Sequence, residues 1–220
     1  MDALASTAPR VLFNCSRQSG KSTISAVLAV HTALTDPGAL VLLLSPTLRQ
    51  SSELFKKCLA VYRAAGRPVP PESETALSLT LDTGSRIVSL PGKEETIRGY
   101  SGVRLLIIDE AARVPGDLYL SARPMLAVSG GRLLALSTPF GTRGWWYDAW
   151  RSEERWERYE IPASECPRIP PAFLEEERRT LGEWWYQQEY LCQFMDAKSQ
   201  AFTRAEVDAA FTEEVEAWAL

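Results

Sequence analysis

The stretch CSRQSGKST, residues 15–23, has the residue types and spacing of a phosphate-binding loop. In the pattern G-x-x-x-x-G-K-[ST], backbone amides surround the phosphates, the lysine contacts the β- and γ-phosphate oxygens, and the hydroxyl ligates Mg²⁺. The end of this pattern is matched here, so Ser22 is also a predicted metal ligand. The residues predicted to contact the nucleotide are Ser16, Arg17, Gln18, Ser19, Gly20, Lys21, Ser22 and Thr23.

Cys15 stands where the pattern has its first glycine. That position mainly sets the turn that leaves the strand, whereas the amides of about the last five loop residues hold the phosphates. A small residue such as cysteine is therefore compatible with binding. The loop lies between an apolar run and a helical pattern, as the motif requires, and this placement favours a nucleotide site over a chance Gly-Lys-Ser.

Two adjacent acids, Asp109 and Glu110, follow the apolar run LLII. Open parallel sheets place their ligands at the carboxyl ends of their strands. We expect Asp109 to hold Mg²⁺ through water, and Glu110 to orient and deprotonate the water that attacks the γ-phosphate. The alternative is a capping pair at the start of a helix.

Hydroxyl and arginine side chains complete the candidate site. Ser137 and Thr138 end a later apolar run, where they could hydrogen-bond the γ-phosphate or Glu110, although a turn that ends the strand has the same pattern. Arginine neutralises the charge of a transferring phosphoryl group. Arg17 is the candidate finger in cis. Arg98 could act as a finger on a neighbouring subunit, and Arg104 and Arg143 are other candidates for this role. The alternative for Arg98 is a solvent-exposed arginine without a catalytic role.

The elements that position these residues alternate along the chain. Four apolar runs separated by helical patterns predict an α/β fold with a mostly parallel central sheet flanked by helices. Residues 77–90, LSLTLDTGSRIVSL, predict a β-hairpin at the edge of the sheet, and residues 67–74 are predicted to form a turn-rich connector. The four apolar runs are RVLFN, ALVLLLSP, VRLLIID and GRLLALSTP.

The C-terminal part combines aromatic clusters with helical patterns. GWWYDAW predicts a helix, WERYEIP a strand, and residues 171–196 one or two helices. Two Trp-Trp-Tyr clusters, at residues 145–147 and 184–186, could stack on nucleic-acid bases. Their helical spacing instead favours packing in the core.

Composition limits the function classes. The 220 residues have a formal net charge of −4, which excludes a protein that coats nucleic acid over its whole surface and leaves room for a local contact. Four cysteines without a CxxC pair and a single histidine do not predict a zinc site. Because no run resembles a signal peptide or a membrane span, we expect a cytoplasmic protein with no membrane contact.

Four motifs, in this order, resemble the ATPase domain of the large terminase subunit of tailed bacteriophages. They are SRQSGKST, IRGYSGVRLLIIDEAARV, LALSTPFGTRGWWYDAW and PPAFLEEERRTLGEWWYQQEYLCQF. The likeness extends from about Val11 to about Asp196. It implies a P-loop NTPase of the additional-strand, catalytic-glutamate type that uses ATP and Mg²⁺ to move double-stranded DNA into a procapsid. It also implies a ring of subunits, a portal protein and a small terminase subunit as partners in the host cytoplasm.

The resemblance assigns roles to the same residues. Lys21 and Ser22 would bind the phosphates and Mg²⁺, and Arg17 would sense or stabilise the γ-phosphate. Asp109 and Glu110 would be the acidic pair, and residues 137–139 would couple hydrolysis to movement.

The chain departs from this family at both ends. Only ten residues precede Val11, none of them the glutamine of the family's adenine-recognition segment, and some two dozen follow Asp196, where the family's nuclease domain begins. We expect an ATPase domain over residues 1–196, with a helical part at about 171–196, and a linker or the start of a missing nuclease domain at 197–220. Nuclease activity is not predicted. The alternatives are a nucleotide-binding remnant without turnover and a helicase-like DNA-stimulated ATPase.

Overall fold

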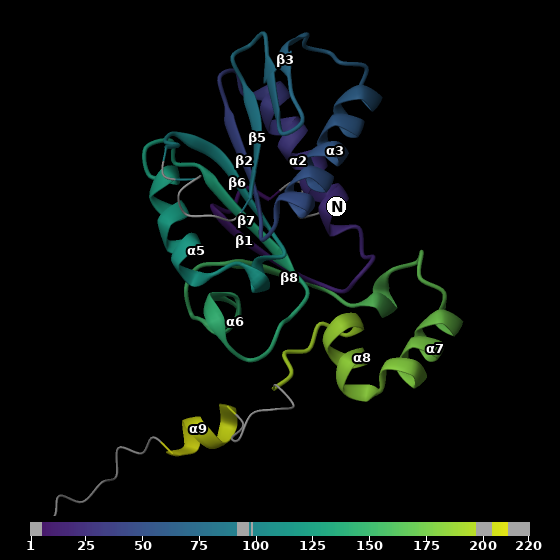
Figure 1. The fold of residues 1–220 in the computed structure, drawn as a ribbon. Helices are drawn as coiled ribbons and strands as arrows, with labels where there is room; N and C mark the ends of the chain where they lie inside the picture. The colour runs from purple at the N-terminus through teal and green to yellow at the C-terminus, as the bar shows by residue number, and fades with distance from the viewer. Residues whose placement is uncertain (1–5, 92–96, 98, 197–203, 211–220) are drawn as a thin grey trace, which may run out of the picture.

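The computed structural model describes residues 6–91, 97, 99–196 and 204–210 (Figure 1). An eight-stranded sheet forms the centre, in the order β3-β4-β5-β2-β6-β7-β1-β8. The strands are β1 (Arg10–Cys15), β2 (Leu40–Ser45), β3 (Pro71–Glu74), β4 (Ser78–Leu81), β5 (Arg86–Pro91), β6 (Val103–Asp109), β7 (Arg132–Ser137) and β8 (Glu157–Ile161). The α-helices are α2 (Lys21–Thr35), α3 (Leu48–Ala64), α5 (Gly116–Ala122), α6 (Gly144–Arg151), α7 (Pro171–Leu181), α8 (Glu183–Tyr190) and α9 (Arg204–Ala210). Short 3₁₀ segments are η1 (Ala111–Arg113), η2 (Arg123–Leu126) and η3 (Ala163–Glu165).

The strands that carry the chemical motifs pair in parallel. β7 lies between β1 and β6, so an additional strand separates the strand before the phosphate loop from the strand that ends in the acids. Asn14 pairs with Ser137, and Leu136 pairs with Asp109. This register brings the carboxyl ends of the three strands to one edge of the sheet.

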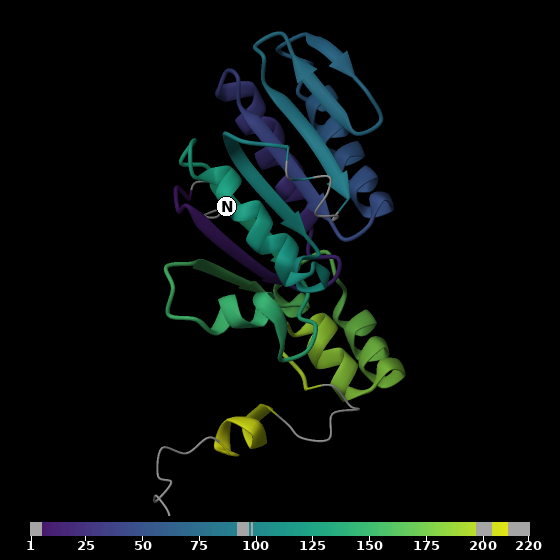
Figure 2. The same cartoon turned by 60° about the vertical axis from the view of Figure 1, so that its left-hand side comes forward.

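Both faces of the sheet are covered, which explains the nearly continuous apolar strands. All six residues of β2 are buried. Leu43 faces the apolar cluster that includes α2 and α3, whereas Leu42 and Leu44 face the cluster that includes α5 and α6. Figures 1 and 2 show these helix pairs on opposite faces. The predicted α/β architecture, flanked by helices, is therefore confirmed.

The edge beyond β2 differs in part from the sequence prediction. The hairpin is present as β4 and β5, which are antiparallel around Gly84, a residue with φ 79°. β5 also pairs in parallel with β2, however, so the hairpin is tied into the sheet. The prediction of a connector over residues 67–74 was wrong for Pro71–Glu74, which forms the edge strand β3 against β4. Proline is tolerated there because an edge strand leaves part of its backbone unpaired.

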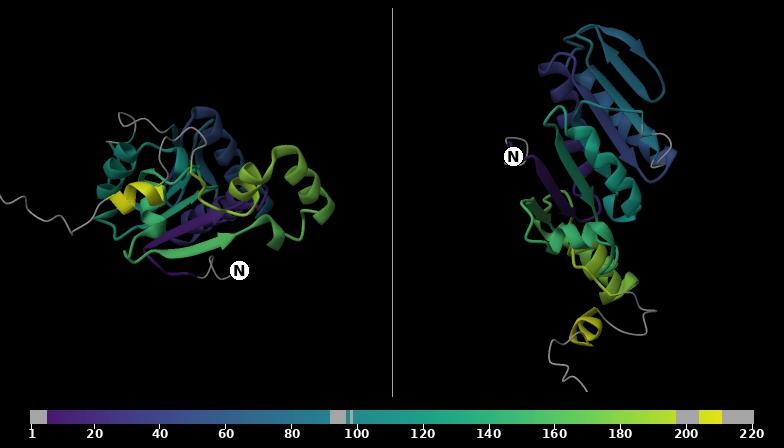
Figure 3. Two further views of the ribbon diagram at one scale, coloured as in Figure 1. Left: turned by 90° about the horizontal axis from the view of Figure 1, so that it is seen from below. Right: turned by 90° about the vertical axis from the view of Figure 1, so that its left-hand side faces the viewer.

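Helices α7 and α8 form a small helical subdomain (residues 163–192) with its own apolar cluster. Gly182, with φ 77°, separates the two helices. Figures 2 and 3 show the pair at one end of the molecule, following β8. Asn14 of β1 donates from Nδ2 to the carbonyl of Cys192 at 2.8 Å, which fixes the end of the subdomain to the sheet. The buried residues of the cluster are Ala163, Leu174, Tyr186 and Tyr190.

The aromatic cluster on α6 packs inside the protein, as its spacing favoured. Trp146 is 2% exposed, and Trp145 stacks on Tyr119 with ring centroids 4.0 Å apart. On α8, Trp185 is 42% exposed. In the described part of the chain, no helix has the length and hydropathy needed to cross a membrane.

All four cysteines are buried and free. Burial raises the pKa of Cys15, Cys58 and Cys192 to about 12, so these thiols stay protonated at neutral pH. Cys15 at the start of the phosphate loop therefore acts as a small apolar residue.

Candidate nucleotide-binding site

The phosphate loop joins β1 to α2 at the carboxyl edge of the sheet. Gly20 is the N-cap of α2 and has φ 92°, a conformation that favours glycine. A Cβ atom there would lie 2.7 Å from Nη2 of Arg168, so space also restricts this position to glycine. The 15-residue helix α2 begins directly after Gly20, so its N-terminus lies at the end of the loop, an arrangement that binds anions.

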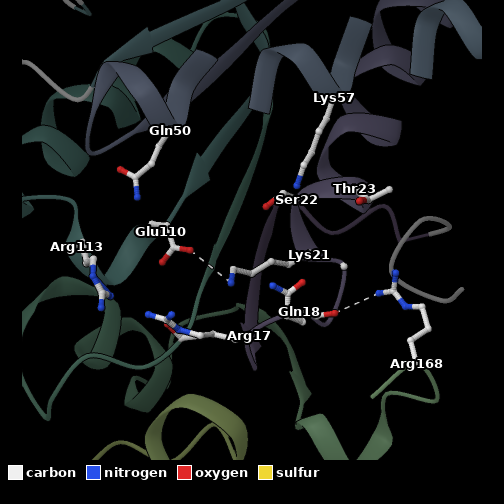
Figure 4. A pocket seen from close by; sticks show the side chains of 12 residues that line it. Arg17, Gln18, Lys21, Ser22, Thr23, Gln50, Lys57, Glu110, Arg113 and Arg168 are labelled. Atoms are coloured by element: carbon white, nitrogen blue, oxygen red, sulfur yellow. Dashed lines mark hydrogen bonds and ion pairs between the residues drawn. The ribbon is translucent and has the colours of Figure 1, made fainter. Parts of the chain in front are cut away.

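A cavity of about 460 Å³ opens over this loop (Figure 4). Within the described part of the chain, five cationic side chains and one carboxylate line it. Such a cavity suits a polyanion such as a nucleoside triphosphate. The lining residues are Arg17, Gln18, Gly20, Lys21, Ser22, Thr23, Gln50, Lys57, Glu110, Arg113, Thr138 and Arg168.

Asp109 lies beneath the cavity at the end of β6. It is 7% exposed, and its Oδ2 accepts a hydrogen bond from Oγ of Ser22 at 3.4 Å. Burial, with the charge of Glu110 as a second cause, raises the pKa of Asp109 to about 6. The structure thus brings together the two predicted metal ligands, one from the helix and one from the strand.

Glu110 directs its carboxylate into the cavity from a strained backbone. Its φ of 52° is uncommon for a residue with a side chain, and such strain concentrates at functional sites. Oε1 lies 3.4 Å from Nζ of Lys21, and the two side chains point toward each other in Figure 4. The turn after Glu110 is closed by a hydrogen bond from the amide of Arg113 to the carbonyl of Glu110 at 2.8 Å.

Ser137 and Thr138 lie at the end of β7 and are both buried. Oγ of Ser137 accepts a hydrogen bond from the amide of Ala112 at 3.2 Å, and Thr138 lines the cavity. The serine therefore contacts the turn that follows Glu110, and the threonine faces the space where phosphates would bind.

Arg17 connects the phosphate loop to the helical subdomain. Its Nε lies 2.6 Å from Oε2 of Glu189 on α8, and its backbone amide donates to the carbonyl of Glu189 at 3.1 Å. The side-chain hydrogen bond raises the pKa of Arg17. The guanidinium also lines the cavity, so it lies between a carboxylate of α8 and the cavity.

Some predicted residues lie outside the cavity lining. The side chain of Ser19 lines a separate hollow of about 40 Å³ beneath the loop, and the buried Oγ of Ser16 has no hydrogen-bond partner. Arg98 is outside the described residues. Arg104 pairs with Asp36 at 2.6 Å, at the amino end of β6 and so away from the site.

Sequence reasoning missed four residues of the cavity and the partner of Arg17. Gln50 and Lys57 are seven residues apart on α3, the spacing of one helix face, which was the only sequence signal. Arg168 reaches the loop from the segment before α7, and its Nη2 donates to the carbonyl of Gln18 at 3.3 Å. The other missed residues are Arg113 and Glu189.

Comparison with known proteins identifies the family of this chain. A family model described as "Terminase large subunit, T4likevirus-type, N-terminal" matches residues 12–208. The chain belongs to this family. Related terminase large subunits occur in Thermus phage G20c, with 30% identity over 162 residues (65% of this chain and 33% of that protein), and in Escherichia phage T5, with 26% identity over 215 residues (92% and 48%). This terminase chain thus spans a third to a half of the length of these relatives.

Solved large terminase structures share the α/β fold of this terminase chain. The large terminase ATPase domain of Thermus phage P74-26 superposes with a TM-score of 0.77 and 23% identity, covering 86% of this chain and 90% of that domain. The large terminase of a thermophilic bacteriophage, solved in complex with ADP, superposes with a TM-score of 0.73 and 15% identity, covering 86% of this chain and 48% of that one. The predicted family and fold are both confirmed.

Proposed function

We propose that the chain is the ATP-hydrolysing motor domain of a phage or prophage terminase large subunit, which drives double-stranded DNA into a procapsid. The observation that carries this proposal is the 3.4 Å contact between Lys21 of the phosphate loop and Glu110 at the end of the acidic strand, inside the cationic cavity. This contact supports a site in which Lys21 would bind phosphate and Glu110 would act as a base on water. Membership of the terminase family supports the link to DNA packaging.

The cavity would bind the triphosphate through its cations and amides. Lys21 faces Glu110 in the structure, and the γ-phosphate would take over this lysine as its counterion. The amides of the loop and the start of α2 would surround the β-phosphate. Arg113 lines the same cavity and would add positive charge at the γ-phosphate. Its Cζ atom lies 4.4 Å from the centroid of the Phe140 ring.

The residues present fit Mg²⁺, as ATP chemistry requires. Ser22 supplies a hydroxyl, and Asp109 supplies a buried carboxylate that can hold the ion through water. No group of three or more His, Cys, Asp or Glu side chains gathers into a metal site among the residues that the structure describes. Bound there, Mg²⁺ would neutralise charge on the β- and γ-phosphates.

Hydrolysis would proceed with Glu110 as the general base. The Glu110 carboxylate accepts a proton from water, and the water oxygen forms a bond to the γ-phosphorus. The bond from the γ-phosphorus to the β–γ bridging oxygen breaks, and its electron pair leaves with ADP. Arg17 would stabilise the charge on the transferring group. Arg98 remains a candidate for the same role from a neighbouring subunit.

Arg17 would also couple hydrolysis to movement. It pairs through Nε with Glu189 of α8 in the structure, and a bound γ-phosphate would compete with Glu189 for this guanidinium. Binding of ATP would therefore loosen α8 from the loop, and release of phosphate would restore the pair. Through the hydrogen bond of Ser137 to Ala112, β7 would follow changes at the Glu110 turn. The moving helical subdomain would act on DNA in a ring docked on the portal protein with a small terminase subunit, in the host cytoplasm.

The test is steady-state ATP hydrolysis with and without linear double-stranded DNA. Wild type, Glu110→Gln and the control Glu72→Gln, an exposed residue on β3, are compared. We expect DNA-stimulated turnover in wild type and control, and loss of turnover in Glu110→Gln. Wild-type protein without turnover, or Glu110→Gln with normal turnover, would contradict the proposal.

A further inference from the structure

A second hollow, of about 280 Å³, lies beside the phosphate cavity. Gln18 and Arg168 line both spaces, so the two are neighbours across the tip of the loop. The hydrogen bond from Arg168 to the carbonyl of Gln18 keeps the arginine at this border. A ligand whose phosphates lie on the loop could therefore extend past Arg168 into the second hollow. The lining residues are Gln18, Arg168, Ile169, Pro170, Phe173 and Tyr190.

The walls of this hollow suit a flat aromatic ring. Phe173 of α7 is 41% exposed, and its ring centroid lies 6.3 Å from that of Tyr190 at an interplanar angle of 75°. The Tyr190 hydroxyl donates to Oε2 of Glu177 at 2.6 Å, so its polar end is already used. Aromatic faces with apolar neighbours bind bases by stacking, and the Arg168 guanidinium adds a planar cation.

Other hollows in the described part of the chain fit a base less well. The space beneath the loop has a volume of only about 40 Å³. The space on the other side of Tyr190 shares Arg17 with the phosphate cavity and has Trp185 in its wall, but the carboxylates of Glu177 and Glu189 also line it, and they would repel an anionic nucleotide. Among these hollows, the one that contains Phe173 combines aromatic walls and contact with the phosphate loop with a described lining that has no carboxylate.

We propose that this hollow binds the adenine ring of ATP, with Phe173 as a stacking residue contributed by the helical subdomain. The proposal rests on the proposed function, because it requires the triphosphate on the loop. Gln18 and Arg168 are the polar side chains of the lining, so the base is held mainly by stacking. A stacking site distinguishes purines poorly, and GTP is expected to bind within a few-fold of ATP.

The experiment measures binding of ATP, GTP and inorganic tripolyphosphate, each with Mg²⁺, by isothermal titration calorimetry on the full chain. We expect wild type to bind ATP more tightly than tripolyphosphate. Phe173→Ala should weaken ATP about tenfold and leave tripolyphosphate unchanged, because stacking is lost and the phosphate contacts remain. Phe173→Tyr, which keeps the ring, should retain the affinity for ATP. Trp185→Ala, an exposed aromatic of α8 outside this hollow, is the matched control.

The outcomes separate the two proposals. An ATP-to-tripolyphosphate affinity ratio that is unchanged in folded Phe173→Ala overturns the base site and leaves the phosphate site intact. Equal affinity of wild type for ATP and tripolyphosphate does the same. If GTP binds a hundredfold more weakly than ATP, the base is recognised by hydrogen bonds and the stacking site is wrong. Failure of tripolyphosphate to bind wild type removes the phosphate site, and the base site with it.

Discussion

Glu110 combines backbone strain with an unusual partner for a base. Its left-handed φ of 52° costs on the order of 1 kcal/mol, and its carboxylate faces Lys21 rather than solvent. In the nucleotide-free protein this pair keeps both charges balanced inside the cavity. Binding of the triphosphate would release the carboxylate, so that it becomes free to accept a proton only when substrate is present.

Replacing Glu110 by glutamine should separate binding from turnover. We expect kcat to fall by about 10²–10⁴, the usual contribution of a general base. ATP affinity should be kept or slightly increased, because Lys21 no longer has a carboxylate as a competing partner. Single-turnover kinetics with labelled ATP and equilibrium binding measure the two effects. Loss of binding together with turnover would show that Glu110 has a structural role.

Asp109 should lower the stability of the nucleotide-free protein at neutral pH. Its pKa in the folded state is about 6, above the ordinary value of 3.8, because burial disfavours the charged form. The folded protein thus binds more protons than the unfolded chain between about pH 4 and pH 6, and stability from this group is lost as the pH rises through that range. Relative to wild type, Asp109→Asn should gain on the order of 3 kcal/mol at pH 7 and less than about 1 kcal/mol at pH 4. Urea unfolding at both pH values, without nucleotide or metal, measures the difference.

At the residue level, the sequence predicted the site where motifs are contiguous. The loop and the acids were found because each group of residues is consecutive in the chain and follows an apolar strand. Arg168 was missed because it lies 150 residues from Gln18, and only folding brings them together. Glu189 was missed for the same reason, since nothing in the pattern of α8 marks its contact with Arg17.

The contact between the phosphate loop and α8 is the feature that matters at the level of elements. Glu189 is 5% exposed, so its carboxylate depends on the Arg17 guanidinium for compensation of its charge. The same guanidinium lines the phosphate cavity. In the proposed mechanism, this one side chain would transmit occupancy of the nucleotide site to α8.

Neutralising Glu189 should weaken the coupling between ATP binding and the helical subdomain. We expect Glu189→Gln to bind ATP a few-fold more tightly, because Arg17 no longer has to leave a carboxylate, and to lose part of its DNA stimulation. The matched control is Glu183→Gln, which removes the exposed Arg178 pair of 2.6 Å on the same subdomain and should change neither quantity. Titration calorimetry and DNA-stimulated ATPase assays provide the measurements. Equal behaviour of the two variants would contradict a coupling role.

Element types were more predictable than element pairing. Apolar runs identified β1, β2, β6 and β7 because buried parallel strands have few polar residues. The pairing of β5 with β2 depends on contacts between segments that are distant in the sequence. Strand β3 was missed because its residues, PESE, are all exposed and show no strand pattern. The sequence left open whether residues 171–196 form one helix or two. Gly182, with φ 77°, ends α7, so the segment forms two helices.

At the scale of the whole molecule, an Arg98 that acts on the nucleotide site of a neighbouring subunit would make full ATPase activity depend on assembly into a ring. ATP turnover should then rise more than in proportion to protein concentration. A mixture of Arg98→Ala and Glu110→Ala subunits should recover part of the activity, because each can supply what the other lacks at a shared site. A mixture as inactive as either variant alone would count against this assignment.

The buried thiols make the native chain suited to site-directed labelling. Cys15, Cys58, Cys166 and Cys192 are 7% exposed or less, so maleimide dyes should react slowly with all of them in the folded protein. A cysteine introduced at the exposed position of Trp185 would be the fast-reacting one. A fluorophore placed there, with a second on an exposed position of the sheet, could report the position of α8 in single molecules with and without ATP, without prior removal of native cysteines.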